Sequence, residues 1–153
     1  FPYAAYKQEM RELFFGPYYE QSLTVKKGGR ELLAALKNAH IPVALATSTA
    51  QASVLKELKD AGIRDYFDQV VCGDMVSHSK PHPEIFLTAC AALGAKPEKT
   101  IVIEDSYNGI RAAHAGGMMP VMVPDMLQPT EEIEKMTIAV CESLLVVKEN
   151  IGL

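Results

Sequence analysis

Two adjacent carboxylates directly follow a short apolar run in the second half of the chain. Residues 101–109 read IVIEDSYNG, so Glu104 and Asp105 stand behind three β-branched residues. Like charges side by side repel one another unless a positive charge lies close to them. Mg²⁺ suits this role, because proteins hold it with one or two carboxylates together with waters and phosphate oxygens. The pair therefore predicts a Mg²⁺ site; the competing interpretation is that both acids only complement the dipole of the helix that follows.

Groups able to bind phosphate follow two other apolar runs. Thr47 and Ser48 come after the run at 42–46, and a hydroxyl there can donate to a phosphate oxygen, helped by the free N–H groups of the next helix. Lys80 precedes a predicted helix start, where the helix dipole disfavours a cation unless an anion binds beside it. Each residue alone has a simpler interpretation: Ser48 or Thr49 as a helix cap, and Lys80 as a surface lysine.

The elements that must position these groups alternate along the chain. Short apolar runs predict buried strands at 42–46, 70–72, 100–103 and 121–123. Helical periodicity with Gly or Pro at the boundaries predicts helices at 6–14, 32–39, 54–61, 86–93 and 108–115, then a tail at 130–150 with one or two short helices and a weak strand near 138–140. The strand spacing of about 28 to 30 residues is typical of βαβ units. We therefore expect an α/β fold, a Rossmann-like three-layer core with a parallel sheet between helices.

This topology gathers the candidate groups at one place. In an open parallel sheet, ligands bind outside the carboxyl ends of the strands. Thr47 and Ser48 follow one strand, Lys80 lies in the loop after the next, and Glu104 with Asp105 ends a third. We therefore expect hydroxyls, an ammonium and two carboxylates on one rim, where they would suit a phosphoryl group beside Mg²⁺.

Composition limits the function further. The 153 residues fit one domain, and the net charge of −4 without a basic stripe argues against a nucleic-acid or membrane partner. The apolar runs of the sequence fall well short of the roughly 18 residues that a membrane span needs. Three widely spaced cysteines favour reduced thiols and a cytoplasmic location. His82 and His114 are expected to be structural or solvent-facing, and His40 and His78 show no metal-ligand spacing.

Three segments resemble motifs of a known family. VALATS at 43–48, SKPHPEIF at 79–86 and IVIEDSYNG at 101–109 resemble the second, third and fourth motifs of the haloacid dehalogenase-like superfamily, in the branch of β-phosphoglucomutase and small-molecule phosphatases. The resemblance covers about residues 23–125 in the correct order. It implies that Thr47, with Ser48 beside it, and Lys80 bind the transferring phosphoryl group. It also implies that Asp105 holds Mg²⁺ with Glu104 supporting or sharing it, and that Ser106 and Asn108 shape the metal loop.

The sequence departs from this family in one respect. The family's first motif, an Asp-x-Asp after a leading strand, supplies the nucleophile and the acid/base, and no such motif occurs here. Residues 1–22 resemble the last helix of a helical cap, so the expected domains are this cap remnant and a core at 23–153 without its first strand. We therefore expect an incomplete sheet with unpaired edges, completed by a missing N-terminal segment or by a complementing chain.

The resemblance implies a function for the intact protein. It would be a Mg²⁺-dependent phosphohydrolase of a small phosphorylated metabolite, acting through an aspartyl-phosphate, while this chain alone would be inactive. A phosphomutase would use the same residues and stays an alternative. So does a non-catalytic module that binds phosphate and metal.

Overall fold

The computed structural model describes residues 2–14, 16 and 24–153. Its helices and strands follow one another as α1 (Tyr3–Phe14), α3 (Gly29–Asn38), β1 (Ala44–Thr47), α4 (Gln51–Asp60), β2 (Gln69–Cys72), α5 (Glu84–Leu93), β3 (Ile101–Glu104), α6 (Tyr107–Ala115), β4 (Met119–Met122), α7 (Glu131–Met136), β5 (Ala139–Val140) and α8 (Leu144–Asn150). The predicted alternation of strands and helices is thus confirmed, and the fold is α/β.

Strand β4 begins two residues earlier than predicted. The sequence predicts this strand at 121–123, whereas it runs from Met119 to Met122 and includes Pro120. Pro120 has no N–H to donate to a sheet, which is why the run before Val121 reads as a loop. It is tolerated because its carbonyl still accepts from Ile138 N at 2.8 Å, on the side of β5.

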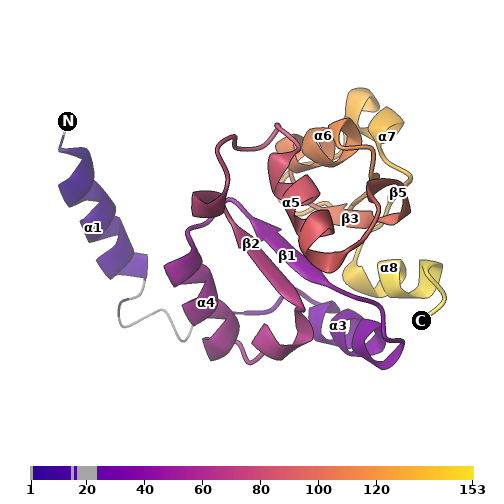
Figure 1. Cartoon of the computed structure of the whole chain (residues 1–153), viewed down its shortest axis with the longest axis horizontal. Coiled ribbons are helices and arrows are strands. Elements are labelled where there is room, and N and C mark those ends of the chain that lie inside the picture. The colour runs from indigo at the N-terminus through magenta and orange to yellow at the C-terminus, as the bar shows by residue number, and fades with distance from the viewer. Residues whose placement is uncertain (1, 15, 17–23) are drawn as a thin grey trace.

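The strands form two separate parallel sheets. One pairs β1 with β2, with Thr47 opposite Cys72, and the other has the order β3-β4-β5. Helix α5 holds the two together, because its buried Ile85 and Phe86 share one apolar cluster with Val102 of β3. On the other side of the first sheet, α4 packs against β2, and α3 packs against α8 below the second sheet (Figure 1).

Among the described residues, nothing pairs with the inner edges of the two sheets. Neither β1 nor β3 bonds to the other, although they are the strands whose ends line a common pocket. Ile101 and Ile103 of β3 remain 41% and 36% exposed, which is unusual for apolar residues of a parallel sheet. The expectation of an incomplete parallel sheet is therefore confirmed.

Helix α1 lies apart from the rest of the fold (Figure 1). Tyr3 and Leu13 on this helix are 66% and 69% exposed. Residues 17–23 lie outside the described part of the chain, so the expected domain boundary after residue 22 stays a prediction. Among the described residues, every helix is too short or too polar to cross a membrane.

Candidate active site

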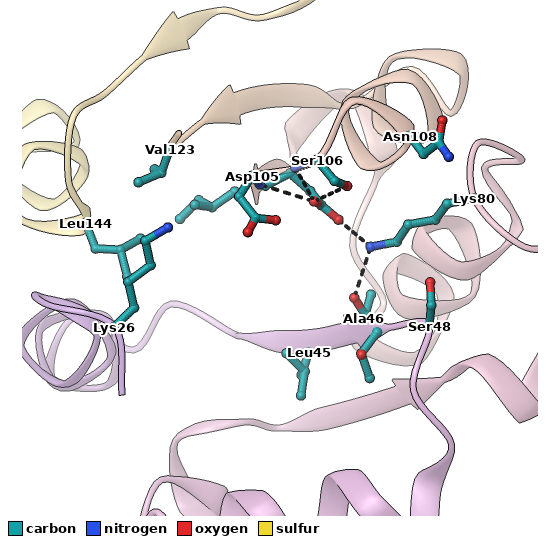
Figure 2. A pocket seen from close by; sticks show the side chains of 13 residues that line it. Lys26, Leu45, Ala46, Ser48, Lys80, Asp105, Ser106, Asn108, Val123 and Leu144 are labelled. Carbon is teal, nitrogen blue, oxygen red and sulfur yellow. Dashed lines mark hydrogen bonds and ion pairs between the residues drawn. The ribbon is translucent and has the colours of Figure 1, made fainter. Parts of the chain in front are cut away.

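A pocket of about 570 Å³ opens between the ends of β1 and β3 (Figure 2). Because parallel strands point the same way, the residues that follow both strands meet at this rim. All the residues predicted for the site line the pocket, namely Thr47, Ser48, Lys80, Glu104, Asp105, Ser106 and Asn108. The predicted juxtaposition is therefore present, whereas the roles of these residues in catalysis stay predictions.

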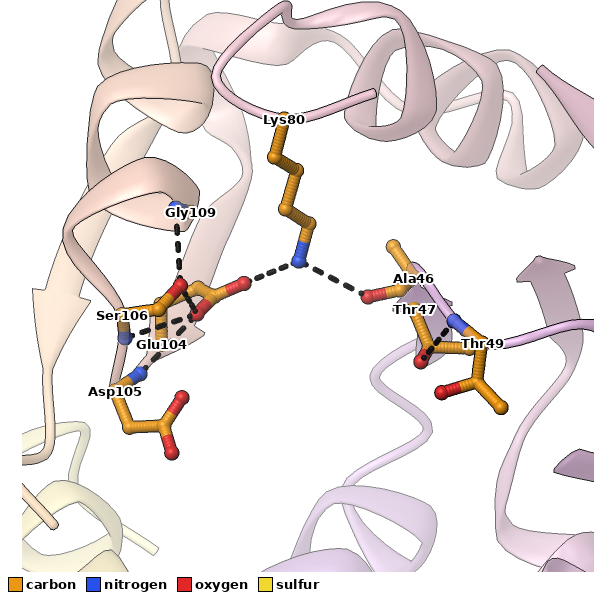
Figure 3. A network of polar contacts seen from close by, with 8 residues as sticks. All are labelled: Ala46, Thr47, Thr49, Lys80, Glu104, Asp105, Ser106 and Gly109. Carbon is orange, nitrogen blue, oxygen red and sulfur yellow. Dashed lines mark hydrogen bonds and ion pairs between the residues drawn. The ribbon is translucent and has the colours of Figure 1, made fainter. Parts of the chain in front are cut away.

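Lys80 is the positive partner of one of the two adjacent carboxylates, that of Glu104. Its ammonium forms an ion pair with Glu104 Oε1 and donates to the carbonyl of Ala46 at 3.4 Å (Figure 3). The two charged side chains are only 11% and 9% exposed, and the ammonium lies 4.6 Å from the centre of the Phe86 ring. The sequence predicted that Mg²⁺ relieves the repulsion between the two adjacent carboxylates. At Glu104 the positive charge comes instead from a lysine 24 residues earlier in the chain.

The second oxygen of Glu104 is also fully engaged. Oε2 accepts hydrogen bonds from the backbone N–H groups of Asp105 and Ser106, both at 3.2 Å, and from the Ser106 hydroxyl at 2.9 Å. Ser106 is the N-cap of α6, because its Oγ accepts from Gly109 N at 3.1 Å. Gly109 has no side chain for a steric reason: a Cβ there would lie 2.0 Å from Glu104 Cδ. Glu104 therefore anchors the loop between β3 and α6, because both of its oxygens are bonded within the site.

Asp105 differs from Glu104 in the exposure of its side chain and in the partners of its carboxylate. Its side chain is exposed, and the part of the chain that the structure describes offers its carboxylate no hydrogen-bond or ion-pair partner. In Figure 3 the carboxylate turns away from the network around Glu104. Of the two adjacent acids, Asp105 is thus the one whose oxygens are available to a ligand in the pocket.

The opposite wall comes from the loop after β1. Thr47 is half-buried, and its Oγ1 accepts from Thr49 N at 3.2 Å, which leaves the hydroxyl proton available. Helix α4 has Ala50 as its N-cap, so the interpretation of Ser48 or Thr49 as the helix cap is wrong. The capping acceptor is instead Asp74 from the loop after β2, whose two oxygens lie 3.1 and 3.2 Å from Gln51 N.

A cluster of polar side chains beside the site was not predicted from the sequence. His78, His82 and Glu84 lie together on the loop that carries Lys80 and at the start of α5, although no ligand spacing was recognised among the histidines. The pKa of Glu84 is held below its ordinary value by a hydrogen bond from Ser77 N–H and then by the His78 side chain. The sequence does place two histidines and a glutamate within seven residues. Whether these side chains meet depends on how the loop folds back, which the spacing alone does not predict.

Comparison with known proteins decides the family. A family model described as haloacid dehalogenase-like hydrolase matches residues 3–123. The chain belongs to the haloacid dehalogenase-like hydrolases. It is 41% identical over 100 residues to the phosphorylated carbohydrates phosphatase of Thermotoga maritima, covering 65% of this chain and 46% of that protein. Over 105 residues it is 33% identical to hexitol phosphatase B of Escherichia coli, covering 69% and 47%.

Solved structures agree with this family. The β-phosphoglucomutase of Clostridium difficile superposes with a TM-score of 0.69 at 28% identity, covering 88% of this chain and 63% of that one. These relatives confirm the resemblance to the branch of phosphatases and β-phosphoglucomutase. This haloacid dehalogenase-like chain spans about half the length of the curated relatives it matches.

Proposed function

We propose that the intact protein is a Mg²⁺-dependent phosphohydrolase of a small phosphorylated sugar or sugar alcohol. The observation that carries this proposal is the meeting of Thr47, Lys80 and Asp105 around one pocket at the carboxyl ends of the strands. The relatives support the substrate class, since one is named a phosphorylated carbohydrates phosphatase and another a hexitol phosphatase.

Each of the three residues would contribute through its charge or hydrogen bond. The Thr47 hydroxyl would donate to an oxygen of the transferring phosphoryl group, and the Lys80 ammonium would neutralise that group and orient the attacking carboxylate. Glu104 would act through Lys80, because their ion pair fixes where the ammonium lies. Phosphoryl transfer depends mostly on such positioning and charge neutralisation.

The residues of the pocket fit Mg²⁺. Asp105 offers an exposed carboxylate at the rim, and the ion prefers hard oxygen ligands with several waters retained. Asp105 would hold the ion, Glu104 would support the loop, and Ser106 and Asn108 would shape it. When bound, Mg²⁺ supplies Lewis-acid stabilisation of charge on the phosphoryl oxygens.

The nucleophile would arrive on a further strand. We propose that a parallel strand pairs between β1 and β3 and carries an Asp to the rim. Its carboxylate would attack the phosphorus and displace the alcohol of the substrate, and water would then hydrolyse the aspartyl-phosphate to inorganic phosphate and the free carboxylate. The free inner edges and the exposed Ile101 and Ile103 support this, because such a strand would pair both edges and cover both side chains. It would come from another stretch of the same protein or from a complementing chain.

Two further assignments belong to this proposal. The domains would be a cap remnant at residues 1–22 and a core at 23–153. Helix α1 would be the last helix of the cap, and its exposed Tyr3 and Leu13 would pack against the other cap helices. A cytoplasmic location is supported by Cys72, Cys90 and Cys141, which are free and buried.

The test is hydrolysis of p-nitrophenyl phosphate by the chain fused to an apolar strand that ends in Asp-x-Asp. We expect Mg²⁺-dependent turnover that Asp105→Ala lowers at least about 100-fold, because a metal ligand is lost. The matched control is Asp65→Asn, which removes an acid at the opposite end of the fold, beside a second pocket, and should leave turnover unchanged. Equal activity of Asp105→Ala and Asp65→Asn would refute the metal-binding role.

A phosphomutase would use the same residues, and the β-phosphoglucomutase neighbour keeps this function in view. The fused protein distinguishes the two with a hexose phosphate as substrate. Release of inorganic phosphate supports the phosphatase, whereas transfer of the phosphoryl group to a second hydroxyl of the sugar would show a mutase.

A further inference from the structure

A cluster of possible metal ligands lies on the loop that carries Lys80. One nitrogen of His78, one nitrogen of His82 and one carboxylate oxygen of Glu84 all lie within 4.8 Å of one another. The His78 Nδ1 and Glu84 Oε2 atoms are 2.7 Å apart, and the two imidazole rings have centroids 4.5 Å apart. Two of the four histidines of the chain thus meet one carboxylate.

This donor set is that of a transition metal. Two imidazoles and one carboxylate form a known ligand set for Zn²⁺, with a fourth position left to water. Imidazole nitrogen favours Zn²⁺ over Mg²⁺, which takes oxygen ligands. We propose that His78, His82 and Glu84 bind a Zn²⁺-class divalent ion, separately from the oxygen ligands expected at Asp105.

The carboxylate of this cluster is positioned before any ion binds. Glu84 accepts from Ser77 N at 2.8 Å and from His78 N at 2.9 Å, so the backbone of the loop fixes its oxygens. Ligand groups that are oriented by outer hydrogen bonds bind metal more tightly than free ones. The binding also has a cost, because the ion replaces the His78–Glu84 contact and the 3.2 Å hydrogen bond from Glu84 N to His82 Nδ1. Both contacts are at the exposed surface, where they are worth little.

The position of the cluster gives the ion a consequence for Lys80. His78 precedes Lys80 by two residues and His82 follows it by two, while Glu84 begins α5. An ion bound to all three would tie both sides of the loop to the helix and fix the backbone from which the ammonium reaches Glu104. Zn²⁺ would thus act as a clamp on the Lys80 loop.

Calorimetric titration with Zn²⁺ alone tests the site on the 153-residue chain. We expect one saturable site, whose affinity falls at least about 100-fold in His78→Gln and in His82→Gln, since losing a ligand costs more than losing an outer partner. Both histidines are exposed, so these variants leave the core intact, and circular dichroism confirms their fold. His114→Gln removes another exposed histidine and should bind Zn²⁺ like the parent chain. Asp105→Ala should also bind it normally, which separates this result from the fate of the proposed function.

Hydrogen exchange tests the clamp itself. Zn²⁺ should slow exchange of the amides of residues 76–85 in the parent chain and in His114→Gln, and should leave that exchange unchanged in His82→Gln. Equal Zn²⁺ affinity in the parent chain and both ligand variants would overturn the site. Saturable binding without slower exchange in this loop would overturn the clamp.

Discussion

Gly109 offers the sharpest test of how the site is held. It is the third residue of α6, and alanine at an ordinary helical position stabilises a helix by about 1 kcal/mol relative to glycine. Here a Cβ would lie 2.0 Å from Glu104 Cδ and 2.2 Å from Oε1, far inside van der Waals contact. The carboxylate cannot simply turn aside, because Lys80 holds one oxygen and Ser106 holds the other.

The magnitude follows from two opposing terms. Overpacking of a well-fitted site costs about 1–3 kcal/mol, which exceeds or matches the helix gain. We therefore expect Gly109→Ala to lower the free energy of unfolding by up to about 2 kcal/mol. In a Lys80→Met/Glu104→Ala background the clashing atoms are gone, and both charges are removed together, so no buried charge is left unpaired. There the same substitution should stabilise the chain by up to about 1 kcal/mol.

Equilibrium unfolding in urea, followed by circular dichroism, measures all four proteins of this cycle. The expected result is a reversal of sign, with a coupling of about 1–3 kcal/mol between position 109 and the ion pair. If Gly109→Ala changed stability by the same amount in both backgrounds, the close approach of Gly109 to Glu104 would not hold the site, and the anchoring role would be wrong.

Two further predictions concern the loops beside the pocket. Asp74→Ala should lower stability by about 0.5–2 kcal/mol in urea unfolding, because Ala50 gives α4 no side-chain cap and Asp74 supplies the acceptor; an unchanged midpoint would contradict this. Glu84 has a pKa lowered from 4.5, chiefly by the hydrogen bond from Ser77 N–H, so it stabilises the fold above that pH and the benefit is lost as pH falls through the lower folded value. Acid unfolding of Glu84→Gln should accordingly depend less on pH below 4.5 than that of the parent chain, and parallel curves would exclude the contribution.

The architecture could be predicted because the periodicity of apolar residues along the chain distinguishes strands from helices. Apolar runs of strand length alternate with helical stripes, and the rule that ligands bind at the carboxyl ends of parallel strands then placed Thr47, Lys80 and Asp105 on one rim. No distance information was needed for that step. That no described strand pairs between β1 and β3 was also predictable, since the sequence lacks the Asp-x-Asp motif that follows a leading strand in the family.

The contacts within the rim could not be predicted in the same way. That Lys80 pairs with Glu104 depends on the length of the lysine side chain and on the path of its loop, neither of which leaves a periodic signal. Asp74 as the cap of α4 likewise joins residues 23 positions apart. The cluster of His78, His82 and Glu84 follows from a loop that folds back on a helix start, so the spacing of its members matches no regular element.

The proposed function depends on a strand that brings a nucleophilic carboxylate between β1 and β3. The measurement is Mg²⁺-dependent hydrolysis of p-nitrophenyl phosphate by the 153-residue chain alone, by the chain fused to an apolar strand ending in Asp-x-Asp, and by the same fusion with Asn-x-Asn. We predict turnover only in the Asp-x-Asp fusion. Equal turnover by the chain alone, or by the Asn-x-Asn fusion, would show that the nucleophile lies elsewhere and that no added strand is needed for catalysis.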